Sequence, residues 1–351
     1  MERIKIGTHE IGEGCPCFIV AEIGINHNGE LILAEKMIKA AAKAGANAVK
    51  FQNYRTEDFI TDRTLTYTYR SQGYKITESQ WDMFKRCEPS KDWLGQLKRL
   101  CDSLNVIFFS TPTSDECLRD LVEVGVLIIK NGSDFLTHLP LLEYMGKTGI
   151  PVIISTGMGD QKDVDDAVAA VKKGGSPVIL MHCTSAYPTS PKDVNLRRMI
   201  SLRERHNVPV GFSDHTEGWC AAVQATTMGA CVIEKHFTLD HNLPGPDHWF
   251  SSTPDEFDEF VFQIHTAQER LGRPNIVPAD IELKSRLEYR LSAVAAQDLN
   301  EGNILVREVV WLKRPGTGIL PRDLNKYLGR KLLKPVKKGD SLKPEDFGLF
   351  E

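Results

Sequence analysis

The sequence lacks any apolar run that approaches the about 18 residues needed to cross a bilayer. Residues 1–10 are charged and lack the apolar stretch of a secretory signal. Positive charge is not in excess either, because 43 Lys and Arg stand against 47 Asp and Glu, for a net charge of -4. Nucleic-acid-binding domains usually carry a basic surface. We therefore expect a cytoplasmic protein with neither a nucleic-acid nor a membrane partner.

Clustered cysteine is also missing. Of the eight cysteines, only Cys15 and Cys17 lie close together. One C-x-C pair without a second cluster is weak support for zinc. The others stand mostly in apolar contexts, where a thiol behaves as a small hydrophobic group. Without an export signal, we expect reduced, structural cysteines.

Short apolar runs alternate with amphipathic stretches as far as residue 240, which is typical of repeated βα units around a parallel sheet. Eight such runs favour a closed (β/α)8 barrel over a doubly wound sheet, which usually has fewer strands. The expected strands are 18–23, 48–51, 106–110, 126–130, 152–155, 178–183, 210–213 and 232–237. Helices are expected, among others, at 31–44, 139–148, 164–173 and 254–271.

The connection after the second expected strand, residues 53–77, is long and polar and carries Tyr67, Tyr69, Arg70 and Tyr74. In compact domains such loops are often lids or binding loops. A disordered excursion is the alternative.

A chain of 351 residues has room for two domains at about 150 residues each. The pattern breaks at 272–278, and short strands with turns follow from 291. We therefore expect a barrel at 1–275, a linker at 276–290 and a small β-rich domain at 291–351. Within that domain a weak repeat, offset by 37 residues, predicts a pseudo-twofold fold. It relates Leu299, Gly302, Leu305 and Glu308 to Val336, Gly339, Leu342 and Glu345.

Polar residues end nearly every expected strand, where barrels carry their catalytic groups. Lys50 and Lys130, if buried, need charged partners or a charged ligand, because unpaired burial costs roughly several kcal/mol. With nearby hydroxyls they would suit a phosphate and a carboxylate; the alternative is an internal ion-pair network, such as Lys50 with Glu22. Residues two apart on a strand share a face. The pairs expected to face the interior are Lys50 with Gln52, Ser213 with His215, and Glu234 with His236.

His215 and His236 end adjacent strands, so their imidazoles are placed to share a metal ion. Two histidines with oxygen donors accept Mn, Fe, Co or Zn, and ligand type alone does not choose among them. Asp247 offers a further acid at the same mouth. Hydrogen-bonded core histidines and a solvated loop acid are the alternatives.

Nine motifs follow one another in a fixed order: Ala21-Glu22-Ile23-Gly24, Asn26-His27-Asn28-Gly29, Lys50-Phe51-Gln52, Ser155-Thr156-Gly157-Met158, His182-Cys183-Thr184, Tyr187-Pro188, Gly211-Phe212-Ser213-Asp214-His215-Thr216, Glu234-Lys235-His236-Phe237-Thr238 and Gly245-Pro246-Asp247. Over essentially the whole chain they resemble the sialic acid (N-acetylneuraminate) synthase family of nonulosonate synthases. The resemblance implies a (β/α)8 TIM barrel followed by a small β-rich antifreeze-like (SAF) domain. Lys313-Arg314-Pro315-Gly316 matches the arginine loop of that domain.

Matching positions assign roles by this resemblance. Phosphoenolpyruvate would be bound by Lys50, Gln52, Thr111, Lys130, Ser133, Ser155, Ser185 and Ser213; the sugar by Glu22, Tyr187, Asp247 and Arg314; and a metal by His215 and His236. The catalytic set is Glu22, Lys50, Lys130 and Asp247. The metal would be Mn, with Mg or Co as alternatives.

In the family, Arg314 would reach the partner's site in a domain-swapped homodimer; a solvated turn arginine is the alternative. The chain departs from the bacterial pattern in two places. Asp134 lies one residue earlier than the family's acid, and Ser185 stands where several members have Asn.

The implied reaction is a metal-dependent condensation of phosphoenolpyruvate with an N-acetylmannosamine-type sugar, with C–O cleavage and release of phosphate. The Asp214-His215-Thr216 run favours a bacterial enzyme with an unphosphorylated sugar. Legionaminic or pseudaminic acid synthesis from a diacetamido-trideoxyhexose is an alternative. A class I pyruvate aldolase with Lys50 or Lys130 as its Schiff-base lysine is another. The last 60 residues alone would also suit a non-catalytic carbohydrate-binding or ice-binding protein.

Overall fold

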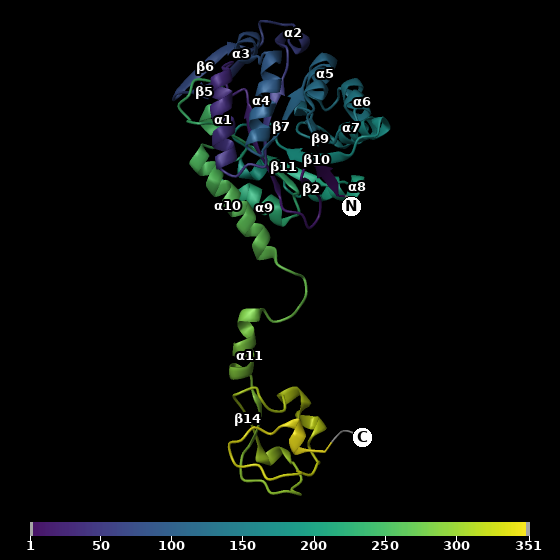
Figure 1. The fold of residues 1–351 in the computed structure, drawn as a ribbon, viewed down its shortest axis with the longest axis vertical. Coiled ribbons are helices and arrows are strands. Elements are labelled where there is room, and N and C mark those ends of the chain that lie inside the picture. The colour runs from purple at the N-terminus through teal and green to yellow at the C-terminus, as the bar shows by residue number, and fades with distance from the viewer. Residues whose placement is uncertain (1–2, 349–351) are drawn as a thin grey trace. The chain divides into compact units, whose positions relative to one another are not determined.

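The computed structural model describes residues 3–348 and divides the chain into two compact units, Met1–Gly272 and Arg273–Glu351 (Figure 1). The expected linker, residues 276–290, contains η4 (Asp280–Glu282) and α11 (Leu283–Tyr289). The last three residues of the expected domain at 291–351 lie outside the described residues. Within the described part, no helix is long and apolar enough to cross a membrane.

The first unit is built on an eight-stranded parallel sheet that nearly closes into a barrel. Its strand order is β7-β4-β3-β12-β11-β10-β9-β8, and every pair is parallel. The predicted (β/α)8 barrel is therefore confirmed. Of the expected strand 126–130, only Ile129 and Lys130 pair, at the end of the strand order. The strands are β3 (Phe18–Gly24), β4 (Ala48–Asn53), β7 (Ile107–Pro112), β8 (Ile129–Lys130), β9 (Val152–Ser155), β10 (Val178–Cys183), β11 (Val210–Asp214) and β12 (Val232–His236).

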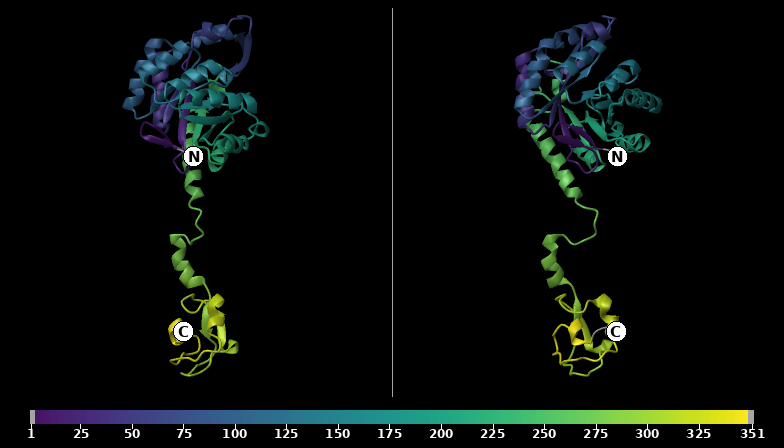
Figure 2. Two further views of the ribbon diagram at one scale, coloured as in Figure 1. Left: turned by 90° about the vertical axis from the view of Figure 1, so that its right-hand side faces the viewer. Right: turned by 45° about the vertical axis from the view of Figure 1, so that its right-hand side comes forward.

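Helices cover the outside of this sheet, as the turned views show (Figure 2). In α7 (Gln161–Gly174), a capping box of Asp160 and Asp163 starts the helix, and Gly175 at φ 103 ends it. Its buried residues follow the helical period toward the sheet. The other barrel helices are α1 (Leu31–Lys43), α4 (Lys91–Ser103), α5 (Asp115–Val124), α6 (Leu139–Lys147), α8 (Arg198–His206), α9 (Cys220–Thr227) and α10 (Pro254–Leu271), with α2 (Thr56–Phe59) and α3 (Gln80–Cys87) in the second βα connection.

The barrel interior changes from apolar to polar along each strand. On β3, Phe18 and Val20 belong to an inner apolar cluster, and Glu22, on the same face, lines a cavity at the strand ends. Ile19 and Ala21 belong instead to the outer cluster, which contains helix side chains. The short hairpin of β1 (Ile4–Ile6) and β2 (His9–Ile11) adds its isoleucines to the inner cluster. Apolar packing therefore fills the interior at the strand starts and leaves polar groups at the strand ends.

The segment expected as a lid or a disordered excursion forms an antiparallel hairpin, β5 (Thr66–Ser71) and β6 (Tyr74–Ser79). Gln72 and Gly73 make its two-residue turn with φ of 51° and 81°, which the tight twist of such hairpins requires. The turn is held in place, because Gln72 Nε2 donates to the carbonyl oxygen of Asn242 at 3.1 Å. The hairpin is therefore an ordered wall beside the last strand-to-helix loop.

The second unit pairs β13 (Ser292–Ala295) with β14 (Val310–Lys313) and adds η5 (Arg307–Val309), η6 (Pro321–Lys326) and η7 (Pro344–Asp346). Its two halves repeat one another, as the offset predicts. Leu299 and Val336 exchange backbone hydrogen bonds of 2.8 and 2.9 Å. Gly302 and Gly339 both have positive φ. Equivalent residues of the repeat therefore occupy equivalent positions.

Replacing Gly146 by alanine is expected to destabilise the barrel by about 1–3 kcal/mol, because a Cβ there would overlap the Val171 carbonyl oxygen where α6 and α7 pack. Gly95, inside α4, is the matched control, since its Cβ would meet only the end of the Arg99 side chain, at 3.4 Å. Gly95→Ala should be neutral or stabilise by about 0.5–1 kcal/mol. Chemical unfolding followed by helical circular dichroism measures both; equal effects would contradict this packing.

Candidate active site

The strand ends surround a cavity of about 640 Å³. Arg314, a predicted site residue, belongs to the second unit, where it follows β14 and its guanidinium lies 5.3 Å from the Tyr289 ring. The cavity brings the other predicted residues together: Glu22, Lys50, Gln52, Thr111, Lys130, Ser133, Ser155, Ser185, Tyr187, Ser213, His215, His236 and Asp247.

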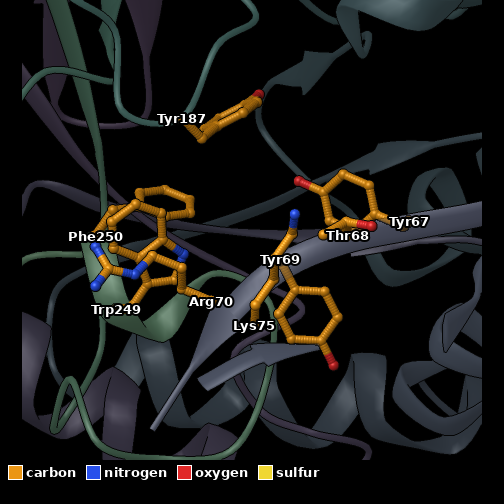
Figure 3. Close-up of a pocket in the computed structure, with 8 residues that line it drawn as sticks. All are labelled: Tyr67, Thr68, Tyr69, Arg70, Lys75, Tyr187, Trp249 and Phe250. Atoms are coloured by element: carbon orange, nitrogen blue, oxygen red, sulfur yellow. The ribbon is translucent and has the colours of Figure 1, made fainter. Parts of the chain in front are cut away.

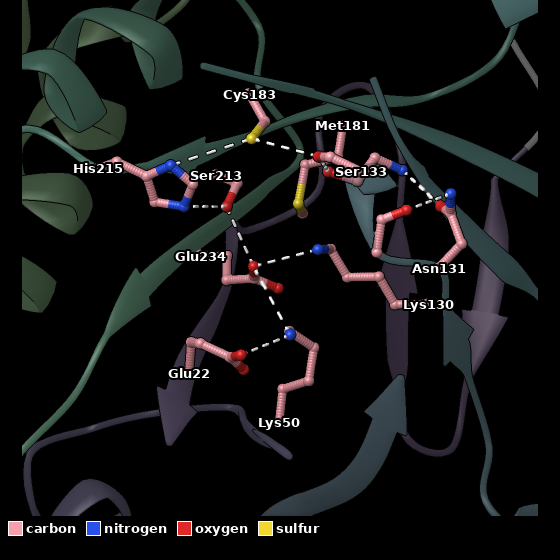
Figure 4. A network of polar contacts seen from close by, with 12 residues as sticks. Glu22, Lys50, Lys130, Asn131, Ser133, Met181, Cys183, Ser213, His215 and Glu234 are labelled. Atoms are coloured by element: carbon pink, nitrogen blue, oxygen red, sulfur yellow. Dashed lines mark hydrogen bonds and ion pairs between the residues drawn. The ribbon is translucent and has the colours of Figure 1, made fainter. Parts of the chain in front are cut away.

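Two lysines and two glutamates form the charged centre of this cavity (Figure 4). Lys50 Nζ lies 2.8 Å from Glu22 Oε1 and 4.0 Å from Glu234 Oε1. Lys130 Nζ lies 3.3 Å from the same Glu234 oxygen. The internal ion-pair network considered from the sequence therefore exists. It lines the cavity, however, so it does not exclude a ligand.

Charge coupling sets the protonation of this centre. Burial would lower the pKa of Lys50, but Glu22 and Glu234 hold it above its usual range, so the amine stays protonated. Burial would raise the pKa of Glu234, but Lys130 and Lys50 hold it below its usual range. For Glu22, burial dominates over the attraction of Lys50 and raises the pKa. Glu22 is thus the carboxylate of the centre that takes up a proton more readily.

Hydroxyl groups border the lysines on the side of β8 and β9. Ser133 and Ser155 share a hydrogen bond of 2.9 Å, and Asn131 Oδ1 accepts from the Ser155 backbone N–H at 2.7 Å. Ser213 Oγ donates to Glu234 Oε1 at 3.0 Å. Within residues 3–348 the buried Thr111 hydroxyl has no hydrogen-bond partner. Such groups beside two ammonium ions suit an anion with several oxygens.

His215 and His236 meet at the mouth with ring centroids 5.3 Å apart. His215 Nδ1 contacts the Thr184 carbonyl oxygen at 2.8 Å; a proton held there leaves the lone pair on Nε2. The Tyr187 ring lies 4.2 Å from the His215 ring and 5.6 Å from the His236 ring. Asp247 Oδ2 lies 3.7 Å from His236 Nδ1. The two rings therefore share one aromatic and acidic corner of the cavity.

The two histidines differ in their protonation. Burial and the nearby positive charge of His215 and Lys50 lower the pKa of His236 well below its usual range, so its ring is neutral. Burial would also lower the pKa of His215, but the Cys183 sulfur, 3.9 Å from Nδ1, raises it. Burial together with the charge of Glu22 raises the pKa of Asp247 to about 7.

As a metal site this corner offers two imidazoles. Across residues 3–348, no three His, Cys, Asp or Glu side chains are grouped to hold a metal ion. The buried His236 Nδ1 has no hydrogen-bond partner there, and the contact with Thr184 orients the His215 ring. Two oriented imidazoles fit a divalent ion whose other ligands are oxygen atoms of substrate or water.

A buried ion pair stands directly before both histidines. Lys235 Nζ lies 3.1 Å from Asp214 Oδ2, with side-chain exposures of 3% and 0%. The two residues are register partners on β12 and β11, and Lys235 also donates to the Thr216 carbonyl oxygen. The pair therefore links the two strand ends that carry His215 and His236.

Glu234, Cys183 and Asp134 also line the cavity, although none of them was in the predicted site set. Glu234 was expected to face the interior with His236, but its contact with both lysines depends on strands distant in sequence. Cys183 follows Met181 on one face of β10; burial raises its pKa, but His215 lowers it to about 7. The displaced acid Asp134 also lines the cavity, and burial raises its pKa. The alternation of β10 was the available signal for Cys183.

A (β/α)8 barrel with charged and imidazole side chains around a cavity at its strand ends defines this unit as a barrel enzyme. The chain belongs to the NeuB family of nonulosonate synthases: residues 37–275 match the NeuB family and residues 290–348 match the SAF domain. The family, the C-terminal SAF domain and the transferase-type synthase class predicted from the sequence are thereby confirmed.

Similar proteins extend over nearly the whole chain. N,N'-diacetyllegionaminic acid synthase of Legionella pneumophila is 39% identical, covering 96% of both chains. Human N-acetylneuraminate-9-phosphate synthase is 32% identical, covering 95% of this chain and 94% of that one. A crystal structure of N-acetylneuraminic acid synthetase from Leptospira borgpetersenii, in complex with citrate, has a TM-score of 0.73 at 34% identity and covers 81% of this chain and 95% of that one.

Replacing Lys235 by methionine is expected to destabilise the barrel by about 3–5 kcal/mol, because it leaves Asp214 buried without its cation. Lys98→Met is the matched control: its partner Asp102 is 57% exposed, so the loss should be about 0–1 kcal/mol. Chemical unfolding of both variants measures the difference. Equal losses would show that the buried pair does not hold the two strand ends.

Proposed function

We propose that this enzyme condenses phosphoenolpyruvate with an N-acetylmannosamine-type sugar to give a sialic acid-like nonulosonate and phosphate. The observation that carries the proposal is the pair of buried amines, Lys50 and Lys130, which lie beside several hydroxyl groups and next to the His215–His236 corner. One half of the cavity suits a doubly anionic substrate and the other half suits a carbonyl. The relatives named as synthases of legionaminic and neuraminic acids support this substrate class.

The lysines hold the anionic substrate. Lys50 stays protonated because two carboxylates lie within 4.0 Å of it. Together with Lys130 and the hydroxyls of Thr111, Ser133 and Ser155 it would bind phosphate and carboxylate; Gln52, Ser185 and Ser213 complete this lining. The bound anion would replace the glutamates as the contact partner of the two lysines. Binding both ends fixes the enol carbon toward the histidine corner, which lowers the entropic barrier to attack.

The histidine corner would hold the sugar carbonyl. A divalent ion on His215 and His236, most often Mn, with Mg or Co as alternatives, would supply Lewis-acid polarisation of the aldehyde when bound. Tyr187 packs against both rings and closes one side of this corner. The pKa of Asp247 is raised to about 7, so this carboxyl can carry a proton at neutral pH, and burial raises the pKa of Glu22 as well.

The proposed reaction forms one C–C bond and breaks the C–O bond that joins the phosphate to carbon 2. Carbon 3 of phosphoenolpyruvate attacks the aldehyde carbon, and the aldehyde oxygen takes a proton from Glu22 or Asp247. Water adds to carbon 2, and its proton passes to the carboxylate that has just given one up. The resulting tetrahedral centre, which carries a hydroxyl and the phosphate ester, breaks its C–O bond to phosphate, and the hydroxyl proton passes to the leaving phosphate as the keto group forms.

The proposed active site also includes Arg314 of a second copy of the chain. A domain-swapped homodimer in the cytoplasm would let Arg314 of one copy meet the sugar's acyl group in the site of the other. Its place in the second unit, after β14, is compatible with such a role.

The aldolase alternative is disfavoured by the charge of its nucleophile. A Schiff-base lysine must be a neutral amine, whereas two carboxylates raise the pKa of Lys50 above its usual range. Glu234 likewise lies 3.3 Å from Lys130. Borohydride trapping with pyruvate would be positive only for the aldolase.

Turnover in water labelled with oxygen-18 is expected to place the label in the keto acid and not in the phosphate, because C–O cleavage leaves the original bridging oxygen on phosphorus. Mass spectrometry of both products measures this. Label in the phosphate would mean attack at phosphorus and would contradict the proposed reaction.

Replacing His215 or His236 by alanine is expected to lower metal-dependent phosphate release by at least about a hundredfold, because each replacement removes one of two imidazole ligands. Isothermal titration with Mn²⁺ should show a matching loss of affinity, and circular dichroism should show a retained fold. His265→Ala, at an exposed position on α10, is the control. Undiminished turnover of wild-type protein after chelation would refute the proposed need for a divalent metal ion.

A further inference from the structure

A second cavity, of about 300 Å³, opens between the β5–β6 hairpin and η3 (His248–Phe250). No role follows for it from the proposed reaction. Figure 3 shows its aromatic walls and the two cationic side chains that reach into it. The walls are Tyr67, Tyr187, Trp249 and Phe250, and the cations are Arg70 and Lys75.

This cavity continues the active-site cavity. Tyr67 and Tyr187 line both. The Tyr187 ring lies 4.2 Å from the His215 ring on one side and 5.3 Å from the Phe250 ring on the other. The second cavity thus begins one aromatic ring beyond the histidines. An aldose whose carbonyl lies at the histidines would extend its far half into this space.

The position of the two cations is costly for the hairpin itself. Arg70 and Lys75 face one another as register partners, and like charges directly opposite destabilise a strand pair. Within residues 3–348, neither has a carboxylate within 4.0 Å, although acids neutralise many other exposed cations of this unit. The turn of the hairpin is nonetheless held against the loop after β12 by Gln72 and Ser71. The arrangement fits a ligand that accepts hydrogen bonds.

The aromatic walls determine which kind of hydrogen-bond acceptor fits this cavity. Ring faces carry negative potential, which attracts cations and apolar C–H groups and repels an anion. Arg70 already uses this attraction, with its guanidinium 5.5 Å from the Trp249 ring centre. The Lys75 amine points into the space between the rings (Figure 3). A neutral group with a carbonyl oxygen for Lys75 and a methyl group for the rings meets both demands, and an acylated amine is such a group.

We propose that this cavity, which we name the distal acyl pocket, binds an acylamino substituent on the far half of the acceptor sugar. The inference rests on the proposed function and narrows its substrate to a sugar with two acylated amines. Lys75 donates to the acyl oxygen, Trp249 and Phe250 pack on the methyl group, and Arg70 orients Trp249.

The test compares three acceptors with phosphoenolpyruvate: N-acetylmannosamine, its 6-phosphate, and a diacetamido-trideoxymannose. Phosphate release gives kcat/KM for each. The wild-type enzyme should prefer the diacetamido sugar over N-acetylmannosamine by about tenfold or more. Lys75→Met and Arg70→Met should each lower that ratio by about tenfold, the effect of one lost charge-assisted hydrogen bond or one displaced ring wall.

Arg63→Met is the matched control, because Arg63 also lies over a tryptophan ring, at 4.1 Å from Trp81, but does not line the pocket. It should leave the ratio unchanged. A wild-type preference for the 6-phosphate that Lys75→Met abolishes would overturn the proposal in favour of an anion site. If both pocket variants turn over with an unchanged ratio, the assignment of the distal acyl pocket is overturned and the proposed function stands. No turnover with any of the three sugars would overturn the proposed function, and the pocket's assignment with it.

Discussion

Two buried carboxylates pair with two buried amines at the mouth of this barrel, and the site depends on that pairing. Lys50 sits 2.8 Å from Glu22, and Glu234 is shared between Lys50 and Lys130. Burying the two ammonium groups without partners would strongly reduce the free energy that stabilises the fold. The pairing makes the cations available to an anionic substrate, because a bound phosphate or carboxylate only replaces one acidic partner with another.

Along the barrel axis, the apolar residues that stabilise the fold lie apart from the polar residues that line the cavity. Apolar side chains at the strand starts, joined by the isoleucines of the β1–β2 hairpin, form the inner cluster. Polar side chains follow two residues later on the same faces, as Glu22 follows Val20 and Lys50 follows Ala48. The Asp214–Lys235 pair adds a second constraint, since it joins the two strand ends that carry the histidines. The proposed reaction chemistry thus rests on strands, and the proposed recognition of the sugar's far end rests on the β5–β6 hairpin and η3.

Much of this was accessible from the sequence. Short apolar runs predicted a strand at each of the eight barrel positions, and helical spacing predicted α1, α6, α7 and α10. Alternation along β4 and β12 placed Lys50 with Gln52 and Glu234 with His236 on shared faces. These patterns are local: a residue's face follows from its position within its own strand. The repeat in the second unit was readable for the same reason, since its halves carry the same turn glycines.

What only the tertiary structure decided is which of these residues meet. The contact of Glu234 with Lys50 and Lys130 joins strands far apart in the chain, and barrel closure sets its distances. The hairpin at 66–79 escaped prediction because most of its side chains are exposed and polar, and its order comes from contacts such as Gln72 with Asn242. The sequence by itself determined the barrel, its polar strand ends and the histidine pair. Long-range packing determined the charge balance and the aromatic pocket, because neither depends on neighbours along the chain.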